Sequence, residues 1–463
     1  MTPIRACLLL SSLAAAGVAQ AQTAAAPAPA PAKAPDSSLT WNGITLYGIV
    51  DVGLQYQTHG TPISDYFPAG SESILQKNSN RSVTGVTPNN LSQSRIGLSG
   101  LEPIKDTGVS FVFRLETFFN PQSGNISDAL KSQVLQNGRP LAEQGTTVDS
   151  SVAGQLFAGA AYAGLSSAQW GSLTFGRHVT PLADGIAKYD PMAASQAFSV
   201  IGFSGLAAGG GDTEDRRLDE SVKYSAKFGF VHVGALYQFN GASGGSNTAV
   251  QAQLGADFLG GGSVDAYYAK KKGAIGTVSL SAAQVAGLPA LGYSPSNSLA
   301  ATISDNTTYS LQALYSFGAP KVFFGYEHIK FENPDDPLPA GTLTIGGYQL
   351  AYVNNTAFTN AKTLEVIWAG AKYAFNPDFD VTVAYYGYRQ KAFASGANAG
   401  CDTDVSAACK GEYNAFSAVA DYKWTKRFDT YLGTMWTGAS DGLANGYLNK
   451  STLSTTTGLR FKF

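Results

Sequence analysis

Residues 451–463 read STLSTTTGLRFKF and alternate between two kinds of side chain. One face of such a strand ends in Phe461 and Phe463, and the opposite face ends in Arg460 and Lys462. Strands of soluble sandwiches alternate as well, so alternation alone does not decide the fold. A final aromatic residue opposite two cations favours a strand with one face in lipid and the other towards a wet lumen. We therefore predict the closing strand of an outer-membrane barrel.

The amino-terminal residues have the pattern of a secretory signal peptide. Arg5 supplies a positive charge, residues 7–18 are apolar, and residues 19–21 read Ala-Gln-Ala, a small-x-small cleavage pattern. The apolar run is too short to span a bilayer. Cys7 precedes most of that run, so it is not the lipidated cysteine of a lipoprotein. The prediction is a signal peptide over residues 1–21 and a secreted mature chain.

The composition excludes several other classes. After residue 21 the chain has no uninterrupted apolar run long enough for a membrane helix. Glycine (52), tyrosine (23) and phenylalanine (25) are abundant, whereas charged residues make up only 14% of the chain. Aromatic residues with one wet end, and glycines in turns, suit a barrel with lipid outside and water inside. The net charge of −2, or −3 without Arg5, gives no reason to expect nucleic acid as a partner.

Charged residues keep to one parity in three predicted strands, residues 44–57, 110–119 and 221–228. Apolar side chains occupy the other parity. Charge on the lipid side is costly near the middle of the bilayer, so the charged parity is predicted to face water. The residues that carry this charge are Asp51, Arg114, Glu116, Lys223 and Lys227.

Turns and loops give the number of strands. Short turns are predicted at 101–108, 166–171, 228–229, 259–262, 318–320, 376–379 and 424–428. Longer polar connections are predicted at 58–93, 120–155, 178–218, 240–248, 271–307, 331–361, 391–412 and 437–451. Seven turns and eight loops join sixteen strands, and an even number is usual for bacterial outer-membrane barrels. Residues 273–280 are weakly strand-like, which leaves eighteen strands as the alternative.

Two other segments have simple interpretations. Residues 22–40 include an Ala/Pro tract that favours extended polyproline II, so we predict a periplasmic spacer before a barrel over residues 41–463. Cys401 and Cys409 lie in CDTDVSAAC, in a compartment that permits disulfides and with no histidine nearby. A local disulfide is therefore favoured over a metal site, and no metal or cofactor is expected.

Several segments resemble the trimeric general porins of Gram-negative bacteria, of the beta-proteobacterial type. These segments are TLYGIVDVGLQY (45–56), NNLSQSRIGLSG (89–100), FRLETFF (113–119), AYAGLSSAQWGSLTFGRH (161–178) and the terminal LRFKF. The resemblance implies an all-β antiparallel barrel of sixteen strands, a homotrimer, and a third loop folded into the lumen. The loop in that position is 178–218, and its Gly-Gly-Gly-Asp at 209–212 is similar to the family's glycine pair before an aspartate.

The resemblance also implies a pore constriction with basic residues on the wall and acidic residues on the inward loop. Simple alternation groups Arg177 with Leu173 and Phe175, so Arg177 is expected past the end of its strand. The chain departs from the family at 159–162, which lacks an arginine, and at 204–208, which lacks an acid. The basic candidates are Arg95, Arg114, Arg177, Arg217 and Lys223. The acidic candidates are Asp184, Asp190, Asp212, Glu214, Asp215 and Glu116. The alternative is that some of these charges only brace the wall, as Arg114 and Glu116 would.

The predicted function is a water-filled channel in the outer membrane of a Gram-negative bacterium, for ions and small hydrophilic solutes. Its expected partners are outer-membrane lipids, lipopolysaccharide, these solutes and two further copies of the chain. A solute-selective channel and an anchor that reaches the cell wall are alternatives. A barrel hydrolase would need a serine and a histidine near the outer leaflet. His328 is on a lipid-facing parity without an outward serine or aspartate at its height, and His59, His178 and His232 are scattered, so no enzyme is predicted.

The terminal aromatic residue is expected to serve assembly rather than transport. Replacement of Phe463 by Ala removes the ring that is predicted to lie in the interfacial belt next to the closing strand. The amount of folded protein in outer-membrane fractions should fall, while the conductance of each channel that does insert should stay the same. A normal amount of the Phe463→Ala protein in the outer membrane would contradict this role.

Overall fold

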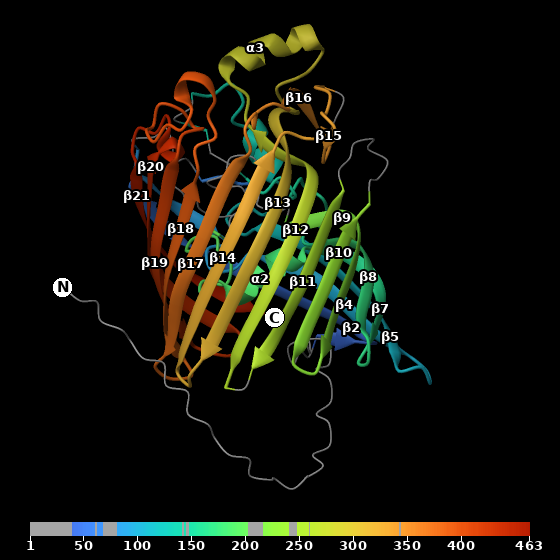
Figure 1. Cartoon of the computed structure of the whole chain (residues 1–463). Helices are drawn as coiled ribbons and strands as arrows, with labels where there is room; N and C mark the ends of the chain where they lie inside the picture. The colour runs from blue at the N-terminus through green and yellow to red at the C-terminus, as the bar shows by residue number, and fades with distance from the viewer. Residues whose placement is uncertain are drawn as a thin grey trace, which may run out of the picture.

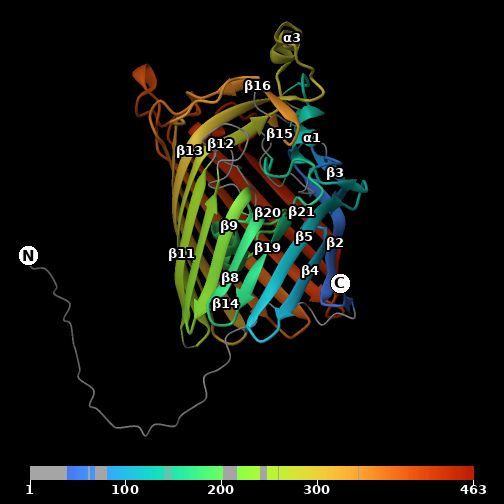
Figure 2. The ribbon, with the colours of Figure 1, turned by 90° about the vertical axis from the view of Figure 1, so that its right-hand side faces the viewer.

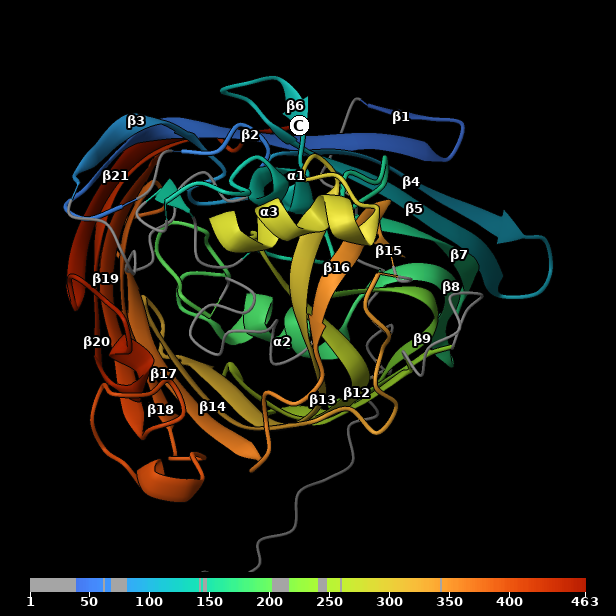
Figure 3. The same ribbon diagram turned by 90° about the horizontal axis from the view of Figure 1, so that it is seen from above.

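A ring of antiparallel strands surrounds a lumen that contains a helix (Figures 1 and 3). The computed structural model describes residues 39–60, 63–67, 81–140, 143–144, 148–201, 216–239, 248–258, 260–341 and 344–463. The predicted signal peptide and most of the predicted spacer lie outside these residues.

Sixteen strands form the wall. They are β2 (Ile44–Gln57), β4 (Arg95–Ile104), β5 (Val109–Asn120), β7 (Ala160–Ser167), β8 (Gly171–Val179), β9 (Arg217–Phe228), β10 (Val231–Gln238), β11 (Ala249–Phe258), β12 (Gly262–Val278), β13 (Ser298–Ser316), β14 (Pro320–Glu332), β17 (Lys362–Ala374), β18 (Phe379–Gln390), β19 (Gly411–Lys423), β20 (Phe428–Asp441) and β21 (Ser451–Lys462). Shorter elements are β1 (Thr40–Trp41), β3 (Val83–Pro88), β6 (Asn125–Ile126), β15 (Thr344–Ile345), β16 (Tyr348–Asn354), α1 (Ala129–Val134), α2 (Pro181–Tyr189), α3 (Ala282–Leu291), η2 (Gly396–Asn398) and η3 (Gly442–Ala444).

The last strand closes the barrel against the first. β21 pairs antiparallel with β2 from Ile49↔Lys462 to Gln57↔Ser454, and β2 pairs with β4 on its other side. The backbone N–H of Phe463 donates to the carbonyl of Gly48 at 3.0 Å. Closure removes the exposed strand edge that lipid could not satisfy. The prediction of a sixteen-stranded barrel closed by the terminal strand is confirmed.

The alternative with eighteen strands is wrong. Residues 274–278 do not start another hairpin but continue β12, and they pair antiparallel with residues 300–304 of β13. The weak strand signal over 273–280 therefore came from an extension of an existing strand. Short turns lie at one end of the barrel and long connections at the other, as predicted (Figure 2).

The wall alternates as the sequence predicted. Leu54, Phe175 and Phe324 are 49–57% exposed on the outer surface, whereas inward neighbours such as Gln55 and Thr174 are polar and buried. No helix within the described residues is long and apolar enough to cross a membrane. Cys401 and Cys409 are joined by a disulfide in the connection between β18 and β19.

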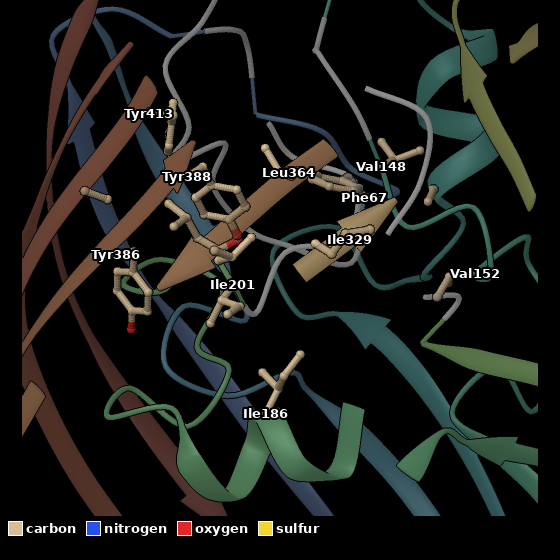
Figure 4. Packing of buried hydrophobic residues seen from close by; sticks show 14 of the residues in the cluster. Phe67, Val148, Val152, Ile186, Ile201, Ile329, Leu364, Tyr386, Tyr388 and Tyr413 are labelled. Carbon is tan, nitrogen blue, oxygen red and sulfur yellow. The ribbon is translucent and has the colours of Figure 1, made fainter. Parts of the chain in front are cut away.

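The connection from β8 to β9 enters the lumen and packs on one half of the wall. Ile186 of α2 and Ile201 belong to one apolar cluster with Leu364, Tyr386 and other inward side chains of the wall (Figure 4). In the same cluster Trp368 is fully buried, and its indole N–H donates to the carbonyl of Tyr189 at 3.1 Å. The predicted folding of the third loop into the lumen is confirmed, and a cavity remains beside β5 to β11.

Candidate functional site

A helix on the inward loop brings an acidic side chain to the basic wall. Thr180 caps α2, because its hydroxyl accepts from the backbone N–H of Ala183 at 3.3 Å, and Pro181 suits the first helical turn. Asp184, one turn along, forms an ion pair with Lys223 Nζ of β9. The same ammonium group donates to the carbonyl of Val179 at 2.8 Å. Two of the predicted constriction residues thus meet across the space between loop and wall.

Three further predicted residues form a cluster on β4 and β5. Glu116 Oε2 lies 2.6 Å from Arg114 Nη2 and 3.7 Å from Arg95 Nε. Tyr47 of β2 donates to Glu116 Oε2 at 3.0 Å and accepts from Arg114 Nε at 2.7 Å. The carboxylate is buried, but both guanidinium groups keep about a third of their surface exposed, at 34% and 38%. The ion pair between Arg114 and Glu116 braces the wall and still presents cations to the lumen.

Arg177 does not lie past the end of its strand, and that expectation is wrong. It lies within β8, where the pairing with β9 shifts register between Gly176 and His178. The shift lets Arg177 and His178 both turn inward, and both are almost fully buried. Arg177 donates to Asp219, Ala158 O and Ser151 O. It joins the wall to the loop after β5 and leaves little guanidinium surface towards solvent.

Arg217 is also buried, at 8% exposure. Its Nη1 lies 2.9 Å from Asp149 Oδ2 in the connection from β5 to β7, and its guanidinium carbon lies 4.6 Å from the ring centre of Phe118. Its Nη2 donates to Gln93 Oε1 at 3.4 Å. Arg217 points inward as predicted. Asp149 neutralises its charge, so Arg217 holds a loop in place and does not face the open lumen.

Of the predicted acids on the inward loop, Asp190 does not face the open space. It is fully buried, and it accepts from Tyr386 Oη at 2.5 Å and from the backbone N–H groups of Met192 and Ala194. Burial raises the pKa of the Asp190 carboxyl, and the Tyr386 hydroxyl opposes that shift. Asp190 therefore anchors the loop to β18. Asp212, Glu214 and Asp215 lie outside the described residues.

A polar network that the sequence reasoning did not identify holds the end of α2 on the wall. Lys188 Nζ lies 3.0 Å from Asp265 Oδ2 of β12, and Tyr189 Oη donates to the same carboxylate. His232 of β10 bridges Asp265 Oδ1 at 3.2 Å and Asp257 Oδ2 at 3.1 Å. Asp257 and Asp265 share the inward parity of adjacent strands, so the parity rule applied to β11 and β12 would have found them.

The space between α2 and the wall of β5 to β11 is a cavity of about 500 Å³. Its lining includes Arg114, Lys223, Lys227 and His232 from the wall and Asp184 from the loop. His178, which the sequence placed in a loop, lies in β8, and its ring stacks on Tyr162 with centroids 4.8 Å apart. Within the described residues, no group of three or more His, Cys, Asp or Glu side chains is arranged to hold a metal ion.

Six ion pairs of the inner wall have a cation that is much more exposed than its carboxylate. In six pairs the cation is 34–41% exposed and the carboxylate only 0–4%. Long lysine and arginine side chains reach over the short acids and keep their charged ends in water. Other pairs differ. Asp184 and Asp219 are 56% and 57% exposed, and Lys227 and Asp257 are equally exposed, at 35% and 36%. Arg217 and Arg460 are mostly buried together with their acids. The six pairs are Arg95–Glu116, Arg114–Glu116, Lys188–Asp265, Lys372–Asp380, Lys423–Asp380 and Lys462–Asp429.

Comparison with known proteins gives one family and a set of structures with the same fold. A family model described as Gram-negative porin matches residues 6–442. The anion-selective porin from Comamonas acidovorans has a similar structure, with a TM-score of 0.59 and 18% identity over 91% of this chain and 99% of that one. OmpT of Vibrio cholerae (TM-score 0.53, 11% identity, 92% and 99% coverage) and a Salmonella typhi OmpF complex with daunomycin (0.50, 16%, 91% and 97%) are also similar. A search of the curated proteins found no match.

Arg217 is expected to matter for stability more than Arg95. Arg217→Ala leaves Asp149 without its partner in a buried setting, so the free energy of unfolding should fall by about 3–5 kcal/mol. Arg95→Ala removes a partly exposed cation at 3.7 Å from an acid that keeps Arg114, so the loss should stay within about 1 kcal/mol. Urea unfolding of the refolded proteins measures both values. Equal losses in the two variants would contradict the bracing role of Arg217.

Proposed function

Because this chain belongs to the family of Gram-negative porins, we propose that its channel conducts anions in preference to cations. The protein is an outer-membrane channel for passive diffusion of ions and small hydrophilic solutes. Such a channel needs a wet, charged passage of suitable width, and its charge preference follows from the side chains nearest the permeating ion.

The observation that supports the anion preference is the recessed position of the wall carboxylates. The six pairs contain six cations and four carboxylates, because Glu116 and Asp380 each pair with two cations. A permeating ion also approaches the exposed ammonium or guanidinium groups more closely than the buried carboxylates. Coulomb energy falls with distance, so the nearer charge dominates in a narrow, partly dehydrated passage. Lys321, 4.9 Å from the ring of Phe323, adds another inward cation on β14.

Asp184 is the acid that faces this basic surface. We place the constriction beside the Asp184–Lys223 ion pair, in the cavity that Arg114 and Lys227 also line. An acid that crosses the passage limits the anion preference, because it offers cations one exposed partner. The role proposed for the buried Arg177, Arg217 and Asp190 is to hold the loops against the wall. The Comamonas porin is described as anion-selective, but at 18% identity the similarity supports only the fold. The anion preference is proposed from the exposed cations of this chain's own wall.

The remaining assignments concern assembly and the absence of catalysis. We propose a homotrimer, since the family resemblance implies one and an OmpT of Vibrio cholerae with the same fold is described in a trimer form. A hydrolytic role is not proposed, because His328 pairs in register with Tyr309 and Glu365 and so has no serine beside it. Residues 1–21 are proposed as a cleaved signal peptide and residues 22–40 as a periplasmic spacer.

Removal of one recessed pair's cation tests the anion preference. Lys372→Gln deletes an exposed ammonium group but leaves Asp380 paired with Lys423 at 2.8 Å, so no buried charge is stranded. In planar bilayers with a KCl gradient, the reversal potential of the parent protein should lie closer to the chloride equilibrium potential than to that of potassium. The reversal potential of the variant should shift towards the potassium equilibrium potential. The shift should be larger at about 0.1 M than at about 1 M salt, because screening is weaker at low salt.

The matched control for that experiment is Lys391→Gln. Lys391 pairs with Glu365 at the loop end of β18 and is 66% exposed on the outside of the barrel. It should leave the reversal potential unchanged. A parent channel that prefers potassium, or equal shifts in the two variants, would overturn the proposal.

The trimer is tested separately by chemical cross-linking of the folded protein in detergent. Bands at up to three times the monomer mass are expected, and conductance in bilayers should appear in groups of three equal steps. A cross-linking pattern that stops at the monomer under conditions that preserve the barrel would refute the homotrimer without affecting the channel function.

A further inference from the structure

Two wall strands are much longer than a membrane crossing requires. β12 has 17 residues and β13 has 19 residues, whereas a tilted transmembrane strand needs about 9–11. The surplus lies at the loop end. There the pairing shifts register between Lys271 and Ala274, where Gly273 has φ 61° and donates to Asp305 Oδ1 at 2.8 Å. A bulge with a left-handed glycine bends a hairpin, so the two strands turn at this point.

Beyond the bend, residues 274–304 form a strap across the mouth of the barrel. Seen from above, β12 and β13 leave the wall and run towards α1 on the other side (Figure 3). α1 belongs to the connection after β5, which lies six wall strands away from β12 in the order of pairing. The strap therefore spans the lumen rather than standing above its own part of the wall.

Hydrogen bonds fix the strap to the far side. Gln133 Nε2 donates to Thr277 O at 2.8 Å and Gln133 Oε1 accepts from Thr277 Oγ1 at 2.7 Å. Asn137 Oδ1 accepts from Leu280 N at 2.7 Å, and its Nδ2 donates to Ser298 O at 2.7 Å. The two side chains thus hold both strands of the strap.

The strap is also packed on both of its faces. Leu299, Ala301 and Ile303 belong to the large apolar cluster that continues into the lumen. Leu280 and Ala300 belong to a second cluster with Leu288 of α3. β16 pairs parallel with the distal end of β13 and widens the cover. A segment buried on both faces, with hydrogen bonds at its tip, is a fixed part of the fold.

The strap carries no charge. Residues 274–304 contain no Asp, Glu, Lys, Arg or His, although charged residues make up 14% of the chain. The ion pairs with partly exposed cations lie on the wall and between the wall and α2. An uncharged bar across a passage restricts solutes by their width and exerts little force on their charge.

We propose that the strap is a size filter for solutes that enter the channel, separate in place and in chemistry from the charged wall that selects ions. The strap narrows the entrance, so its removal changes how large a solute can pass. It does not set the ion preference. The inference rests on the channel function and is independent of the proposed anion preference.

The test is a barrel with the strap removed. Residues 273–304 are replaced by Asn-Gly, which joins Lys272 to Asp305, next to the paired residues Lys271 and Asn306, through a two-residue hairpin turn and removes no charged residue. In planar bilayers the conductance should rise about twofold or more. In liposome swelling, the rate for a trisaccharide relative to glucose should rise, while the reversal potential in a KCl gradient stays at the parent value.

The matched control removes α3 alone. Replacement of residues 282–294 by a short Gly/Ser linker keeps both strands and the contacts of Leu280 and Ser298, so conductance and the trisaccharide rate should stay near the parent values. If the deletion of 273–304 does not fold, the double variant Gln133→Ala, Asn137→Ala releases the tip while the strands remain. It should raise the relative trisaccharide rate in the same direction.

Three results would overturn the proposal. One is a folded strap-free barrel, or a folded double variant, with unchanged conductance and unchanged relative rates. Another is a reversal potential that moves with strap removal, which would tie the strap to ion preference. The third is an α3 deletion that opens the channel as much as strap removal, which would assign the filter to the helix. A parent channel without anion preference would refute the proposed function, whereas the inference about the strap would remain valid.

Discussion

The structure depends on one constraint, that a chain in hydrocarbon must satisfy every backbone N–H and C=O group within itself. A sheet meets this constraint only by closing, and here closure depends on the pairing of β21 with β2, two strands from opposite ends of the chain. Once the ring is closed, alternate side chains must face lipid and lumen. The inward charges, the buried carboxylates and the loop in the lumen all follow from that division.

The same constraint explains how the lumen is filled. The inward loop carries its own apolar side chains, and these pack on Trp368, Tyr386 and neighbouring inward residues of the wall. The cavity beside β5 to β11 stays open, and partly exposed lysines and arginines lie on both halves of the wall. The preference proposed for the channel arises from these exposed cations together with the different lengths of acidic and basic side chains, rather than from an excess of positive charge in the chain, whose net charge is −2.

Much of the fold could be predicted because strand alternation is local. The strand number follows from the spacing of turns and loops, and the closing strand and the inward direction of Arg95, Arg114 and Lys223 follow from parity. Parity failed at Arg177, because a shift in register between β8 and β9 turns two consecutive residues inward. Parity also does not predict which residues form ion pairs. Arg217 faces the lumen as predicted, but Asp149, in a loop 68 positions away, neutralises it. Contacts between distant loops depend on how those loops pack, and no short sequence pattern records that.

A hollow cylinder with a thin wall resists stretching well but flattens easily into an ellipse. A bar that is fixed at both ends across the opening opposes that deformation, because it keeps the two sides at a constant distance. The hydrogen bonds that join Gln133 and Asn137 to the β12–β13 hairpin make such a bar. The entrance of this channel should therefore keep its shape when the surrounding bilayer is compressed or tensed, so that its permeability is insensitive to the mechanical state of the membrane.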